Sequence, residues 1–88
     1  MLNNKDIVLG EYRDDDNNKF LFEEDTILIE MYYDTGDVLK YKYVWEDNKF
    51  VDKVFDESFK IEYYDKKNII LVSDELLYLK LHLKNLKK

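Results

Sequence analysis

Residues 26–45 read TILIEMYYDTGDVLKYKYVW, and most of the chain repeats the pattern of this segment. Apolar or aromatic residues occupy every second position on both sides of the turn Asp34-Thr35-Gly36-Asp37. Such alternation is typical of strands that bury one face. The turn holds one of only two glycines in the chain, where a positive φ is useful. We therefore expect a β-hairpin over residues 26–45.

The same rhythm continues from residue 6 to residue 83, where short alternating runs are separated by polar clusters at intervals of about ten residues. The chain contains no Pro, so its turns are built from Asn, Asp, Gly and Ser. We predict strands at about 6–13, 19–22, 26–33, 38–45, 49–55, 59–64, 69–72 and 76–83.

The C-terminal segment fits two structures. Leucines at 77, 79, 81 and 83 alternate with polar or amphipathic residues, which indicates a strand with one wet face. Leu, Lys and Glu are also good helix formers. As a helix, however, the segment would leave Leu77 and Leu81 exposed on the side opposite its apolar stripe. We favour a strand for residues 76–88 and keep a helix as the alternative.

Short connections make consecutive strands antiparallel. The sequence therefore predicts one small all-β domain over residues 1–88, an up-and-down meander of seven to eight strands. A meander protects its edges by closing into a barrel, so we expect a closed or nearly closed one.

In strand number and spacing the chain resembles a miniature lipocalin-like barrel, although the Gly-x-Trp signature of that family is absent. The resemblance implies a functional alternative, in which the barrel binds a small apolar molecule. We expect Phe, Tyr and Trp to fill most of so small an interior and to leave little room for a ligand.

The residue types present argue against catalysis. The chain has no Cys, one His and two Gly, which excludes thiol chemistry, zinc–thiolate sites and glycine-rich phosphate loops. His82 has no second histidine to share a metal. Asp34-Thr35-Gly36 resembles the aspartic protease motif, but no later glycine completes it. We expect no enzyme activity, no cofactor and no metal.

Two absences bear on location. No run approaches the roughly 20 apolar residues of a membrane span, and the first residues lack the pattern of a signal peptide. We expect no membrane association and a cytoplasmic protein, in a bacterial or host cell.

Charge is unevenly distributed along the chain. The net charge is −6, and residues 1–44 hold eleven acidic and five basic residues, whereas residues 45–88 hold nine of each. In a meander every second turn lies at the same end. The first, third, fifth and seventh predicted turns contain acidic residues and no Lys or Arg. We therefore predict a nearly pure carboxylate rim at one end of the barrel.

Tyrosine is the second surface signal. The chain has eight tyrosines, and two pairs of them are adjacent in sequence, at 32–33 and 63–64, so one member of each pair is expected to point outward. Exposed Tyr is enriched at binding hot spots. The candidate protein-binding residues are Asp14, Asp15, Asp16, Asp34, Asp37, Tyr32 and Tyr64.

These features predict an acidic, non-enzymatic protein-binding module. Its expected partner is a protein with a basic surface, because a focused negative field attracts one. Direct nucleic-acid binding needs clustered Lys and Arg and is not expected. By analogy of class alone, the module resembles inhibitors encoded by phages or mobile elements. Such inhibitors include anti-CRISPR proteins, DNA mimics and immunity proteins, whose targets are nucleic-acid-processing or defence enzymes. The sequence contains no feature that indicates whether the protein is a monomer or an oligomer.

Overall fold

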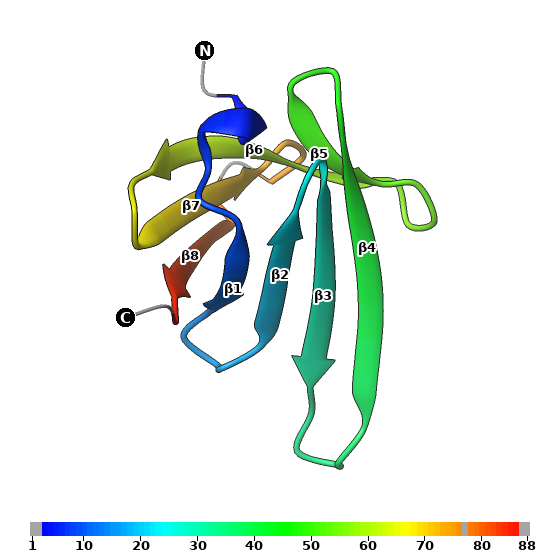
Figure 1. Ribbon diagram of the computed structural model, residues 1–88. Coiled ribbons are helices and arrows are strands. Elements are labelled where there is room, and N and C mark those ends of the chain that lie inside the picture. The colour runs from blue at the N-terminus through cyan, green and yellow to red at the C-terminus, as the bar shows by residue number, and fades with distance from the viewer. Residues whose placement is uncertain (1–2, 77, 87–88) are drawn as a thin grey trace.

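The computed structural model describes residues 3–76 and 78–86. It is an all-β barrel in which eight antiparallel strands follow one another in chain order and the last pairs with the first (Figure 1). A single 3-10 turn, η1 (Asn4–Asp6), precedes the strands. These are β1 (Gly10–Arg13), β2 (Lys19–Glu23), β3 (Thr26–Tyr32), β4 (Val38–Glu46), β5 (Lys49–Asp52), β6 (Glu57–Tyr64), β7 (Asn68–Ser73) and β8 (Lys80–Asn85). The predicted up-and-down barrel is confirmed.

The hairpin of β3 and β4 has the longest register of the barrel, from Thr26 opposite Val44 to Tyr32 opposite Val38. Its turn contains Gly36 with φ of 91°, as the sequence predicted. Other turns place Asn or Asp at positive φ. The short polar side chains of these two residues make the left-handed conformation more accessible than it is for most residues.

Three predicted boundaries are wrong. The first strand begins at Gly10, because η1 occupies the residues where it was expected to start. The fifth ends at Asp52, whose carboxylate accepts hydrogen bonds from the backbone N–H groups of Val54 and Phe55 and so turns the chain. The last strand lies later than predicted, at Lys80–Asn85.

The described part of the C-terminal segment forms a strand and contains no helix. A turn precedes this strand, in which the hydroxyl of Ser73 accepts from the N–H of Leu76, and the N–H of Leu79 donates to the carbonyl of Leu76. Leu77 lies outside the described residues. The alternation predicted for this segment is seen in the burial of Leu83 beside exposed His82 and Lys84.

One end of the barrel is packed and covered. Four aromatic rings meet edge to face in this region, with ring centroids 4.8–5.8 Å apart, from Tyr12, Phe22, Trp45 and Phe50. The segment of η1 lies over this end (Figure 1), where the Asn4 side chain donates to the Asp25 carboxylate at 2.6 Å and Ile7 is buried. The N-terminal segment therefore acts as a plug.

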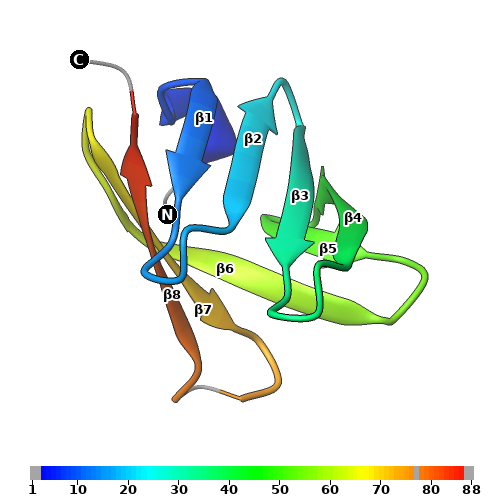
Figure 2. The ribbon, with the colours of Figure 1, turned by 90° about the horizontal axis from the view of Figure 1, so that it is seen from below.

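The opposite end is where the β1–β2 and β3–β4 connections lie. Viewed toward this end, β1 to β4 form one wall, and β6, β7 and β8 cross beside it at an angle (Figure 2).

Candidate functional site: an apolar cavity in the barrel

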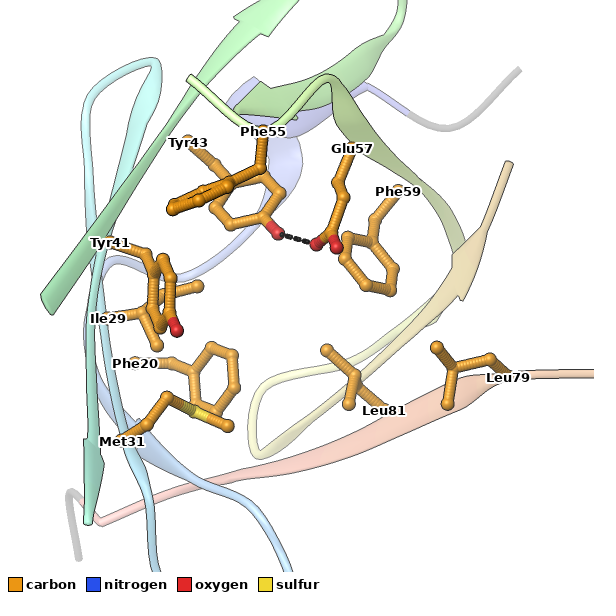
Figure 3. A pocket seen from close by; sticks show the side chains of 10 residues that line it. All are labelled: Phe20, Ile29, Met31, Tyr41, Tyr43, Phe55, Glu57, Phe59, Leu79 and Leu81. Carbon is orange, nitrogen blue, oxygen red and sulfur yellow. Dashed lines mark hydrogen bonds between the residues drawn. The ribbon is translucent and has the colours of Figure 1, made fainter. Parts of the chain in front are cut away.

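A cavity of about 390 Å³ lies between the two walls (Figure 3). This volume is within the ~300–1,000 Å³ that is usual for small-molecule sites. Its lining is apolar or aromatic except for one carboxylate. The ten lining residues are Phe20, Ile29, Met31, Tyr41, Tyr43, Phe55, Glu57, Phe59, Leu79 and Leu81.

Strand alternation explains why most of these side chains point inward. On β3 and β4, Ile29 pairs with Tyr41 and Ile27 with Tyr43, so all four share the inner face. Phe59 on β6 shares its face with Ile61, two positions further along, and both are buried. The sequence predicted these inward faces correctly. It was wrong in expecting the aromatic side chains to leave little room.

The mouth of the cavity is formed by residues outside the strands. Phe55 lies between β5 and β6, and Leu79 lies between β7 and β8. Both line the cavity, yet 61% of Phe55 and 41% of Leu79 is exposed to solvent. Tyr41 contacts Phe55 edge to face, with ring centroids 5.8 Å apart. The cavity therefore opens beside the β5–β6 and β7–β8 connections.

The carboxylate of Glu57 is the one charged group among the lining residues. Its Oε2 accepts a hydrogen bond from the Tyr43 hydroxyl at 3.0 Å (Figure 3). Burial raises the pKa of Tyr43, and the negative charge of Glu57 raises it further. Tyr43 therefore stays protonated at neutral pH and acts as a fixed donor to Glu57.

The predicted acidic candidates on the β1–β2 turn have different roles. Asp14 builds the turn, because its carboxylate accepts from the N–H groups of Asp16 and Asn18 and from the Asn18 side chain. Asp15 and Asp16 are exposed, and neither carboxylate forms an ion pair with a described residue. These two are the freely accessible charges of the turn.

The β3–β4 turn carries the other predicted candidates. Asp34 is exposed, and the Asp37 carboxylate accepts from the hydroxyl of Thr35 at 2.9 Å. Tyr32 is exposed as predicted, with its hydroxyl donating to Glu30 and the Arg13 guanidinium 5.9 Å from its ring centroid.

The outward orientation predicted for Tyr64 is wrong. Tyr64 packs against the core, and Tyr63 is the exposed member of the pair. A shift of register between Ile61 and Tyr63 causes the exchange. A bulge adds one residue to a strand and reverses the alternation beyond it.

The predicted carboxylate rim is partly neutralised. Asp74, in the β7–β8 connection, is 2.9 Å from the Nζ of Lys49 and 3.0 Å from that of Lys60. Lys53 lies within the β5–β6 connection and pairs with Glu46. The rim is therefore not purely acidic, since lysines from neighbouring strands reach it.

Sequence reasoning did not identify the cavity residues as a site. The alternation identified the inward side chains but carried no information about the distance between the two walls. Phe55 and Glu57 were assigned to a strand and to an acidic turn, respectively, and only the fold brings both of them to the cavity.

In the described part of the chain, no set of three or more His, Asp or Glu side chains is arranged to hold a metal ion. Nor does residue range 3–76 or 78–86 contain a helix that is long and apolar enough to cross a membrane. No protein-family model, curated protein or solved structure matches the chain.

Proposed function

We propose that the protein binds a small, largely apolar molecule in the cavity of its barrel. The observation that carries this proposal is a cavity of about 390 Å³ whose lining is apolar or aromatic at nine of ten positions. Burial of apolar ligand surface contributes about 25 cal/mol per Å² before the costs of association. The exposed Phe55 and Leu79 at the mouth provide a route of entry.

Filling the cavity tests the proposal. Met31→Trp adds a large side chain at a half-buried lining position, and Leu28→Trp places the same residue on the exposed face of the same strand. We expect the neutral fluorescent probe N-phenyl-1-naphthylamine to bind the wild type and Leu28→Trp, but not Met31→Trp. Far-UV circular dichroism confirms that each variant is folded. Equal binding by both variants, or no binding by the wild type, would contradict the proposal.

A second candidate function is protein binding through the end that carries the β3–β4 turn. It is supported by the exposure of large apolar side chains beside the acidic turn, at Tyr32, Tyr33, Val38 and Leu39. Exposed aromatic groups are enriched at binding hot spots, and acidic groups around them attract a basic partner. The proposed partner is a protein with a basic surface, such as a nucleic-acid-processing or defence enzyme that the module inhibits.

This second candidate is tested by charge reversal. Asp15, Asp16 and Asp34 are changed to Lys, whereas Asp14 is kept because it builds its turn. The control reverses Glu23, the last residue of β2, and Glu24, in the β2–β3 connection at the plugged end; both are exposed. We expect a bound partner to be lost on the first reversal and on Tyr32→Ala, and kept in the control. If all variants still bind the partner, this surface is not the binding site.

A further inference from the structure

The two ends of the cavity differ in chemistry. Tyr43, Phe55 and Phe59 lie beside the solvent-exposed Glu57 at one end, and Met31, Leu79 and Leu81 lie across the space from it (Figure 3). Tyr43 and Phe59 are in contact, with ring centroids 5.7 Å apart. An aromatic, negatively charged end thus faces an aliphatic end.

The charge at the aromatic end has no basic partner among the described residues. Glu57 accepts from the Tyr43 hydroxyl but forms no ion pair with any Lys or Arg of residues 3–76 or 78–86. Asp52 is its register partner on β5, and its carboxylate is held by the N–H groups of Val54 and Phe55. Two carboxylates therefore act on this end of the cavity, and none of the ten lining residues is basic.

Resting on the proposed ligand-binding function, we infer that the ligand is an amphiphilic organic cation, with an ammonium group at Glu57 and an aliphatic part against Met31, Leu79 and Leu81. Aromatic faces attract ammonium groups through their quadrupole, and this attraction also operates at solvent-exposed sites. The Glu57 carboxylate adds a direct charge interaction. A ligand with a carboxylate head, such as a fatty acid, is repelled by the same charges.

Three ligands with the same eight-carbon chain test this inference: octyltrimethylammonium, 1-octanol and octanoate. Each is titrated below its micellar concentration into the ¹⁵N-labelled protein, and affinity is read from the amide shifts of lining residues. We expect the cation to bind about tenfold more tightly than the alcohol, because its charge is attracted by the Glu57 carboxylate and the aromatic faces, and octanoate to bind most weakly.

Two variants test which residues cause the preference for the cation over 1-octanol. Glu57→Gln keeps an acceptor for Tyr43 and removes the charge, so we expect most of the advantage of the cation over 1-octanol to disappear. Phe55→Leu keeps an apolar side chain and removes an aromatic face, so it should weaken cation binding more than alcohol binding. The control is Glu62→Gln, on the outer face of the same strand, which should change neither affinity.

The outcomes separate the inference from the function on which it rests. If 1-octanol binds and the cation has no advantage, or keeps its advantage in Glu57→Gln, the inference is wrong and the proposed function stands. If none of the three ligands binds, both are wrong. A cation preference that is lost in Glu57→Gln and kept in Glu62→Gln supports both.

Discussion

The Asp74 carboxylate lies between two ammonium groups, those of Lys49 and Lys60, which come from β5 and β6. Hydrogen bonds from both lysines lower its pKa from the ordinary 3.8 to about 2. The backbone N–H of Asp74 also donates to the carbonyl of Ser58. One side chain thus ties the β7–β8 connection to the neighbouring strands.

This pKa predicts a pH dependence of stability. A carboxylate whose pKa is lower in the folded state stabilises that state above about pH 4, and the contribution is lost as the pH falls toward 2. We expect Asp74→Asn to be less stable than the wild type at pH 6, with a difference that narrows between pH 4 and pH 2. Urea unfolding at several pH values measures this. The control is Asp16→Asn, which removes an exposed carboxylate without an ion pair and should change stability little at any of these pH values. If Asp74→Asn is destabilised at pH 2 as much as at pH 6, the prediction is wrong.

Single elements show how local irregularities place side chains. The bulge in β6 lies between Ile61 and Tyr63, and beyond it the strand presents Tyr64 to the core and Tyr63 to solvent. The hydroxyl of Tyr63 donates to Asp65 at the surface. Two adjacent tyrosines therefore have different roles, which their order in the sequence does not reveal.

Truncation of each tyrosine tests the effect of the bulge. Tyr64→Ala removes a ring that packs against the core and should lower the free energy of unfolding by about 2 kcal/mol. Tyr63→Ala removes an exposed ring and should cost less than about 1 kcal/mol. Chemical denaturation of both variants gives the comparison. A larger cost at Tyr63 than at Tyr64 would contradict the prediction.

The N-terminal plug is the second element with a measurable role. Ile7 is buried against the core at the covered end, and its neighbour Val8 is exposed. We expect Ile7→Ala to lower the free energy of unfolding by about 2–4 kcal/mol. Val8→Ala should have little effect, because the Val8 side chain is exposed. The Val8 carbonyl, which accepts a hydrogen bond from the Tyr12 hydroxyl, is kept in this variant. If both variants lower the free energy of unfolding by the same small amount, the plug contributes little to stability.

At the scale of the whole molecule, closure of the barrel depends on a short seam. Among residues 3–76 and 78–86, β1 and β8 pair over two residue pairs, Tyr12 with Asn85 and Arg13 with Lys84, whereas β3 and β4 pair over seven. The N–H of Leu86 adds a bond to the carbonyl of Glu11 at 3.1 Å. The barrel is therefore closed most weakly where its first and last strands meet.

Hydrogen exchange should reveal this seam. Local openings occur first where few bonds must break. We expect the Leu86 amide to exchange well before the paired amides at the centre of the β3–β4 hairpin, measured by NMR under native conditions. Similar protection at both places would mean that the barrel opens as one cooperative unit.

The period-2 pattern by itself determined the class of fold. Alternation in residues 26–45 and its repeats specified antiparallel strands, their inner faces and the order in which they pair. It succeeded because alternation is a local property that every residue of a strand shares. Asp34 to Asp37 also predicted their turn, since its conformation depends on adjacent residues alone.

Only the tertiary structure decided the rest. It placed Tyr64 inside through a bulge, set two lysines around Asp74, and folded η1 over one end of the barrel. It also held the two walls far enough apart to leave a cavity beside Glu57. These features depend on the twist of the strands and on contacts between residues far apart in the chain, which a local pattern does not encode.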